Sequence, residues 1–346
     1  MLRKIWRSLI LSVLCFSLVM GCTRSTPETV ATESGRITIG TTASISTLDP
    51  ADAYSIFAGN LLYNLGDRLY RYKLGTNELE PQLATALPKV SADQLTYTIP
   101  LRRGVVFHDD EPFNASAMKF SLQRFIQNGG SPAFLLSDVI DSISAKGANE
   151  LIIKLKKPFA GFPALLAFSG ACAVSPKAYK IEKGAFNSET FVGTGAYKLT
   201  KFGTDSIVLD AFDRYWGNKA ANRGVNVQFF SSPANLFNAF RTGAIDVAYQ
   251  GLALEQINNL KDNASENTWK MIERSGSGVS YLTLNLKSSP LDRLEVRQAI
   301  AAIMDRPILE SRIFQGQVEP LYSLIPSNLR EQKPVFREYG DRNIEK

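Results

Sequence analysis

The chain has 346 residues, of which 45% are hydrophobic and 21% charged, with 24 glycines and 16 prolines. This composition is typical of a globular protein and excludes a collagen-like, coiled-coil or disordered chain; the length predicts two packed domains. The net charge is +6, but three of the cations precede Cys22, so residues 22–346 carry a surplus of only three. Such a small surplus argues against a nucleic-acid-binding protein.

The histidine and cysteine content limits the possible chemistry. One histidine, His108, excludes sites built on a histidine pair, and three cysteines, Cys15, Cys22 and Cys172, cannot form a disulfide framework. We therefore expect no metal site and no cofactor.

Residues 1–21 have the pattern of a bacterial export signal. Three cations precede an apolar run from Ser8 to Met20, which is too short to span a bilayer as a helix. The run ends in Val19-Met20-Gly21-Cys22, which is similar to the lipobox in which a cysteine is acylated after cleavage. We expect Cys22 to be lipidated and to anchor the protein at the periplasmic, extracytoplasmic face of a bacterial membrane. A plain signal peptide with an incidental cysteine is the alternative.

The next segment, residues 22–35, consists mostly of Thr, Ser, Glu, Pro and Gly and has little apolar surface to bury. Such a composition predicts a flexible tether between the membrane and the folded body. Within that body Cys172 is the only cysteine, and we expect it to be a small buried hydrophobe.

The folded body begins with an alternating segment, residues 36–42, which predicts a short strand. Apolar residues at helical spacing then predict a helix over 55–70, and a second alternating segment predicts a strand over 95–101. Asn114 is the expected N-cap of a helix that runs to about Ile126.

Strands and helices alternate through the rest of the chain. The expected strands are 151–155, 169–176, 197–202, 206–212, 225–230, 243–248 and 280–286. The expected helices are 232–242, 255–263 and 292–304. Repeated strand–helix–strand order predicts an α/β fold with parallel strand pairing.

Two short motifs could be either ordinary turns or chemical sites. Gly193-Thr194-Gly195 could be a phosphate-binding loop, but it lacks the Lys-Ser/Thr of a P-loop and leads into a strand. His108-Asp109-Asp110-Glu111 could be a metal or acid–base cluster, but three consecutive acids are typical of an exposed turn with solvated charges. We expect neither a nucleotide site nor any catalytic residue.

The order of the motifs carries more information than any one of them. The motifs are Leu48-Asp49-Pro50, Leu79–Ala84, Val90–Thr98, Leu101–Asp109, Phe113-Asn114-Ala115, Val192–Leu199, Tyr215-Trp216-Gly217, Gly243–Asp246, Tyr281–Asn285 and Val296–Ile300. Together they resemble the family 5 extracellular solute-binding proteins, the peptide-, dipeptide- and nickel-binding components of ABC importers. The resemblance runs in register from Ile37 to Lys346. It departs at Gln94 and Asp110, where the family usually has glycine, and at Ala196, where it usually has proline.

The resemblance implies a periplasmic-binding-protein-like class II α/β fold with two lobes. The implied first lobe comprises residues 36–60 and 185–275, with a subdomain, 61–184, inserted in it. Residues 276–346 would be the hinge and the start of a second lobe that is incomplete. Members of the family extend beyond the position of Lys346. In the peptide-binding members, the acidic residue that pairs with the α-amino group of the peptide lies in that extension.

Lobes of this kind close over a solute, and the contacts come from loops at strand ends. We expect ligand contacts from Thr42, Ala43, Ser44, Tyr249, Gln250, Tyr281 and Asn285. Gly276 and Gly278 are the expected hinge positions. Ordinary loop or core packing is the alternative at each of these positions.

The predicted function is that of a monomeric, membrane-anchored solute-binding protein, with no enzyme activity and no nucleic-acid partner. It would deliver peptides or similar small polar solutes to the permease subunits of an ABC transporter. Two alternatives stay open. One is an envelope hydrolase that uses Cys172 or His108; the other is a truncated or split gene product whose Leu294, Ile300 and Ile303 are left uncovered.

Overall fold

A computed structural model describes residues 35–264, 269–273, 276, 278–329 and 332–342. The predicted signal peptide, 1–21, and the predicted lipidation site, Cys22, lie outside these residues. Within the described ranges, no helix combines the length and the apolar character that crossing a bilayer requires.

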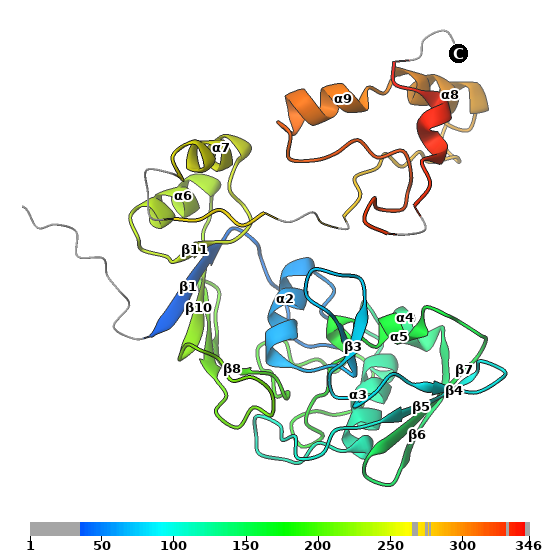
Figure 1. Ribbon diagram of the computed structural model, residues 1–346, viewed down its shortest axis with the longest axis vertical. Helices are drawn as coiled ribbons and strands as arrows, with labels where there is room; N and C mark the ends of the chain where they lie inside the picture. Colours follow the sequence, from blue (N-terminus) through cyan, green and yellow to red (C-terminus); the bar gives the residue numbers. More distant parts are fainter. Residues whose placement is uncertain (1–34, 265–268, 274–275, 277, 330–331, 343–346) are drawn as a thin grey trace, which may run out of the picture.

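A five-stranded sheet forms one side of the body, in the order β11-β1-β10-β9-β8 (Figure 1). Its strands are β1 (Arg36–Thr41), β8 (Tyr197–Phe202), β9 (Ser206–Ala211), β10 (Gly224–Phe229) and β11 (Val247–Ala248). β1 pairs in parallel with β10 and β11, while β9 is antiparallel to both β10 and β8. The predicted parallel pairing is confirmed, and the carboxyl ends of β1, β10 and β11 meet at one edge of the sheet.

Three helices belong to this side of the body: α2 (Ile56–Leu65), α6 (Pro233–Arg241) and α7 (Leu254–Asp262). α2 begins where Ser55 Oγ accepts a hydrogen bond from the Ala58 amide at 3.2 Å, which satisfies one free N–H of the first turn. Its apolar face, including Leu62 and Leu65, is buried against residues of the five-stranded sheet.

A second, antiparallel sheet lies on the other side of α2, in the order β4-β5-β7-β6 (Figure 1). Its strands are β4 (Lys89–Val90), β5 (Thr96–Pro100), β6 (Ile140–Lys146) and β7 (Glu150–Leu155), and the hairpin β2 (Tyr70–Tyr72) and β3 (Leu79–Pro81) precedes it. Short helical segments follow: α4 (Phe134–Ser137), α5 (Phe162–Leu165) and η1 (Ser169–Ala171). α3 (Ala115–Gln127) packs on this sheet, and Asn114 Oδ1 accepts from the Ala117 amide at 3.0 Å, so the predicted N-cap is confirmed.

Two buried polar groups join these layers. Arg124 of α3 donates from both terminal nitrogens to the Asp49 carboxylate, at 2.7 and 2.6 Å, and the side chains are 3% and 0% exposed. The Asp67 carboxylate accepts from four side chains distant in sequence: Gln82 at 2.6 Å, Trp216 at 2.8 Å, Thr194 at 3.0 Å and Tyr215 at 3.1 Å. Burial raises the pKa of Asp67, and the hydrogen bonds from Trp216, Thr194 and Tyr215, together with the charge of Arg68, oppose that rise.

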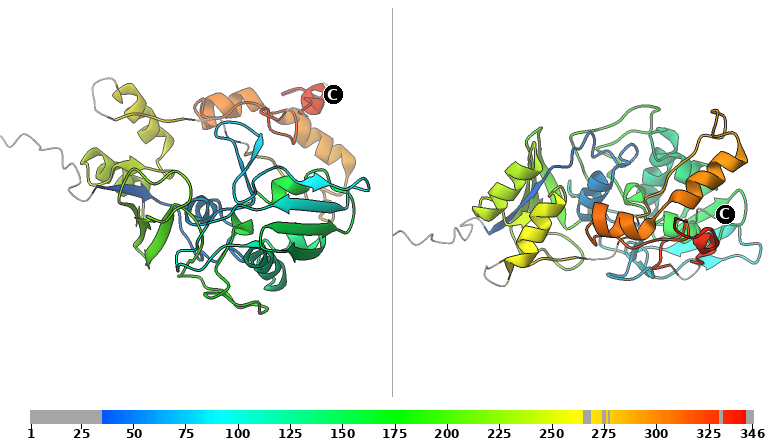
Figure 2. Two further views of the ribbon diagram at one scale, coloured as in Figure 1. Left: turned by 60° about the horizontal axis from the view of Figure 1, so that its bottom comes forward. Right: turned by 90° about the horizontal axis from the view of Figure 1, so that it is seen from above.

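The chain after α7 is built differently. It contains α8 (Leu294–Ile303), α9 (Arg306–Ile308), the π-helical turn η3 (Leu309–Ile313) and the 3₁₀ turn η4 (Val335–Tyr339). Figures 1 and 2 place α8 and α9 at the same end of the molecule as α6 and α7, after an extended stretch. Leu294 and Ile303 are 55% and 63% exposed, whereas Ile300 is half-buried.

Two sequence-based expectations are wrong, and a third is confirmed only in part. Residues 280–286 form no strand, since no other described segment pairs with them, and the segment 169–176 is the short turn η1 followed by irregular chain. The motif His108–Glu111 forms a turn in which Asp110 is exposed, as expected, but His108 itself is half-buried. Its ring packs edge-on to Phe212 with the centroids 5.0 Å apart, and both of its nitrogens contact the glycine turn at Gly193 and Gly195.

Candidate functional site

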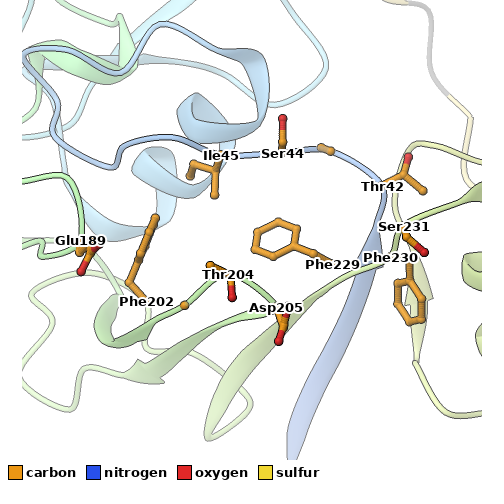
Figure 3. Close-up of a pocket in the computed structure, with 12 residues that line it drawn as sticks. Thr42, Ser44, Ile45, Glu189, Phe202, Thr204, Asp205, Phe229, Phe230 and Ser231 are labelled. Carbon is orange, nitrogen blue, oxygen red and sulfur yellow. The ribbon is translucent and has the colours of Figure 1, made fainter.

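A cavity of about 530 Å³ lies at the edge of the five-stranded sheet where β1 and β10 end (Figure 3). On one side it is bounded by Thr42, Ala43, Ser44 and Ile45, which follow β1. On the other side lies the turn between β8 and β9, and Figure 3 shows the rings of Phe202 and Phe229 between the two. The remaining lining residues are Glu189, Gly203, Thr204, Asp205, Phe230 and Ser231. Three of the predicted ligand residues, Thr42, Ala43 and Ser44, therefore lie together in the lining.

Tyr249 and Gln250 lie next to this cavity rather than in its lining. The Tyr249 amide donates to the Gly40 carbonyl at 2.8 Å, which holds the residues after β11 beside the end of β1. The Tyr249 hydroxyl accepts from Asn60 Nδ2 at 2.8 Å. Gly251 has a φ of +90°, and a Cβ there would lie 1.9 Å from Thr42 Oγ1, so only glycine allows this close approach. The loops after β1 and β11 are thus brought into contact.

Tyr281 and Asn285 are not brought to this edge. Tyr281 is 71% exposed, and Asn285 makes only local hydrogen bonds, to Ser288 and Lys287. The predicted hinge residues Gly276 and Gly278 have no positive φ and no close neighbour that a Cβ would meet. Their conformation does not require glycine, and their hinge role stays a prediction.

A second cavity, of about 270 Å³, lies on the same loop further along the chain. Its lining is Ser46, Thr47, Asp52, Ala53, Tyr54, Ser55 and Ser131. The Tyr54 ring packs edge-on to Phe134 and Phe168, each with its centroid 6.0 Å away. One loop, residues 42–55, therefore lines both cavities, and the buried Asp49–Arg124 pair fixes that loop between them.

Sequence reasoning missed several of these residues. Phe229 ends β10 and Phe230 and Ser231 follow it, and the parallel pairing of β10 with β1 would have placed them at the same edge. Thr204 and Asp205 lie in a β-hairpin turn, and no sequence signal places that turn over the β1 loop. Tyr54 and Asp52 come from a turn whose shape depends on Asp49 and Arg124.

Burial makes the two groups that could serve a hydrolase, Cys172 and His108, poorly reactive. Burial raises the pKa of the Cys172 thiol to about 12, so the thiolate is scarce at neutral pH. Burial lowers the pKa of His108 to about 4. Its Nδ1 lies 3.3 Å from the Gly193 amide, which donates to it, and its Nε2 lies 3.1 Å from the Gly195 carbonyl. Across the described residues, no three His, Cys, Asp or Glu side chains gather where they could hold a metal ion.

Comparison with known proteins places this architecture. A family model for bacterial extracellular solute-binding proteins, family 5 (middle part), matches residues 78–346. The probable D,D-dipeptide-binding periplasmic protein of Escherichia coli is 29% identical over 313 residues, which cover 88% of this chain and 60% of that protein. The dipeptide-binding protein of Escherichia coli is 30% identical over 305 residues, which cover 80% and 55%. The chain thus spans 55 to 60% of the length of these curated relatives.

Solved structures show the same fold. The periplasmic binding protein DppA from Helicobacter pylori, in complex with peptide STSA, superposes with a TM-score of 0.74 at 24% identity, covering 89% of this chain and 66% of that one. NikZ from Campylobacter jejuni, in complex with Ni(L-His), gives a TM-score of 0.70 at 24% identity, with 82% and 56% covered. The α/β fold is therefore that of the periplasmic binding proteins of family 5, and the chain belongs to this family.

Proposed function

We propose, from this family membership, that the chain is the peptide-binding component of an ABC importer and delivers its ligand to permease subunits. The dipeptide-binding protein of Escherichia coli is 30% identical to the chain over the 305 residues compared. In our proposal the ligand contacts Thr42, Ala43 and Ser44 in the larger cavity, and Tyr249 and Gln250 beside it. Tyr281 and Asn285 would reach it from the second lobe when the lobes close.

One observation carries the site assignment. The loops that follow β1, β10 and β11 meet at the carboxyl edge of the sheet, and a cavity of about 530 Å³ opens there. Ligands of α/β proteins bind outside the carboxyl ends of parallel strands, because the loops there can vary while the sheet stays rigid. Hydroxyls of Thr42, Ser44 and Thr204 can bond the backbone of a peptide, and Phe202 and Phe229 add apolar surface.

We propose the same division of the chain as the sequence indicates. Residues 36–60 and 185–275 form the first lobe, 61–184 its inserted subdomain, and 276–346 the hinge and the start of the second lobe. The two described sheets support this division, since β4–β7 all come from 61–184 and β8–β11 from 185–275. Cys22 would hold this monomeric protein at the outer face of a membrane through its lipid.

The absence of enzyme activity is also proposed. Two observations support it: the buried Cys172 thiol stays protonated, and His108 is a weak base whose two ring nitrogens contact Gly193 and Gly195. No cofactor is needed for the proposed binding.

Thermal melting of the full chain with a panel of di-, tri- and tetrapeptides tests the proposal. A ligand present at 100 times its Kd stabilises the folded state by about 2.7 kcal/mol, which raises Tm by several degrees. The exposed Ser44→Trp variant would fill the cavity and abolish the shift, whereas Ser142→Trp, at an exposed position of β6, would keep it. Unchanged melting with every peptide would contradict the proposal.

The lipid anchor has its own test. Labelling of producing cells with a radioactive fatty acid should mark the wild-type chain and not Cys22→Ser. Equal labelling of both would overturn the assignment of Cys22.

A further inference from the structure

The linings of the two cavities are acidic, although the chain as a whole is basic. They contain three carboxylates, Asp52, Glu189 and Asp205, and no lysine, arginine or histidine. Residues 22–346 carry a net charge of +3. The sign of the cavities is therefore opposite to that of the protein, and a negative field at a binding site favours a cationic ligand.

In the smaller cavity, the Asp52 side chain forms hydrogen bonds with the described residues through only one of its two carboxylate oxygens. Its Oδ1 accepts from the Ser131 amide at 3.1 Å and from Ser131 Oγ at 3.2 Å, and Oδ2 has no partner among the described residues. The next aromatic ring, Tyr54, is fixed edge-on against Phe134 and Phe168. A carboxylate with a free oxygen beside an aromatic ring suits an ammonium or guanidinium group, which both can attract.

Glu189 and Asp205 lie at the rim of the larger cavity. Both side chains are exposed, and neither forms an ion pair with a described lysine or arginine. The Phe229 amide donates to the Asp205 carbonyl at 3.0 Å, which fixes the β8–β9 turn against the end of β10. Phe202 and Phe229 supply an apolar floor beneath this rim. Lysine and arginine side chains match such a site, because an apolar stem ends in a cation.

We propose that the acidic linings of the two cavities select peptides with a positively charged side chain, so that the preferred ligands contain lysine or arginine. The inference rests on the proposed peptide-binding function and adds the charge of the ligand to it.

The experiment is a calorimetric titration of the full chain with Ala-Lys-Ala, Ala-Gln-Ala and Ala-Glu-Ala. We expect Ala-Lys-Ala to bind about 5-fold tighter than Ala-Gln-Ala, since one exposed charge pair adds only modest affinity, and Ala-Glu-Ala to bind most weakly. Raising the salt concentration should reduce the preference, because exposed charges are screened.

Variants assign the preference to residues. Asp52→Asn, Glu189→Gln and Asp205→Asn should each lower the ratio of lysine to glutamine affinity about 2-fold, and the triple variant should abolish it. Asp141→Asn, which removes an exposed acid on β6 in the other sheet, should leave the ratio unchanged. The circular dichroism spectrum and the Tm of each variant without peptide serve as the folding control.

The outcomes separate the two proposals. Binding of all three peptides with equal affinity, or a preference that the triple variant retains, overturns the charge selection and leaves peptide binding intact. Absence of binding by every peptide overturns the proposed function, and the charge selection with it.

Discussion

The body of the protein, up to Leu260, and the C-terminal segment after it have similar hydrophobic patterns but bury their apolar residues to different extents. Every buried hydrophobic residue of the described chain lies between Leu48 and Leu260. After Leu260, among the residues that the structure describes, the one buried side chain is the polar Ser323. Both regions contain amphipathic helices, but every sheet among the described residues lies in the body.

α3 and α8 illustrate the difference. α3 buries Met118, Leu122 and Phe125 against the second sheet, whereas α8 buries none of its residues. The periodicity of a sequence thus predicts that a helix forms, but its stabilisation comes from the surface on which it packs. Four substitutions, each with a counterpart in the other region where the chain offers one, test this contrast.

The largest effect is expected at the buried ion pair. Arg124→Ala leaves the Asp49 carboxylate uncompensated in the core, which should lower the free energy of unfolding by about 3–5 kcal/mol. The counterpart Arg306→Ala breaks a pair with Asp341 whose side chains are 23% and 19% exposed, and should cost about 1 kcal/mol or less. Urea unfolding followed by tryptophan fluorescence measures both. Equal losses would mean that the two regions are packed alike.

Truncation of a leucine gives the next largest difference. Leu62 is fully buried in α2, so Leu62→Ala should cost about 3 kcal/mol through lost burial and a cavity. Leu294 is 55% exposed, so Leu294→Ala should change stability by less than about 0.5 kcal/mol. The same urea titration decides between them, and a large loss at Leu294 would show that α8 is covered in solution.

The pH dependence should also belong to the body, since His108 is the only histidine. Burial lowers the pKa of His108 to about 4 from its usual 6.5. Between these values the unfolded chain binds a proton that the folded chain does not, so stability falls as the pH falls through this window. At about 1.4 kcal/mol per pKa unit the loss approaches 3 kcal/mol. His108→Gln should show a shallower decline in Tm from pH 6.5 to pH 4; an identical decline would refute the assignment.

The smallest effect is expected at two glutamines with left-handed backbones. Gln94 has a φ of 59° in the body, and Gln315 a φ of 48° in the C-terminal segment. Replacing Gln94 by glycine removes steric strain and should stabilise the body by about 0.5–1 kcal/mol. Gln315→Gly should leave the main unfolding transition unchanged, because the segment buries no apolar core. Scanning calorimetry resolves these shifts in Tm.

Much of the fold follows from local signals in the sequence. The Asn114 cap, the alternation in residues 36–41 and the hairpin of β8 and β9 are all confirmed, because each depends on residues close in the chain. The strand predicted at 280–286 has the same alternation and does not form. A strand needs a neighbouring strand for its hydrogen bonds, and the sequence of the segment does not reveal whether one is present.

The candidate site could be predicted only in part, for the same reason. The positions of Thr42 to Ser44 could be predicted because these residues directly follow a strand. Asp205 and Tyr54 reach the cavities through long-range packing that involves the β8–β9 turn and the Asp49–Arg124 pair. At Gln94 and Asp110, where the resemblance departs from glycine, both residues adopt a positive φ.

The carboxylate of Asp67 affects which substitutions this sequence can tolerate. It is the shared acceptor for Gln82, Thr194, Tyr215 and Trp216. Loss of one donor leaves the carboxylate with three bonds, but loss of the carboxylate leaves four donors unsatisfied at once. The donors are free to be replaced one at a time, whereas the acceptor is not. Tolerance to substitution is therefore expected to be asymmetric: Asp67 should accept replacement less readily than any one of its four donors.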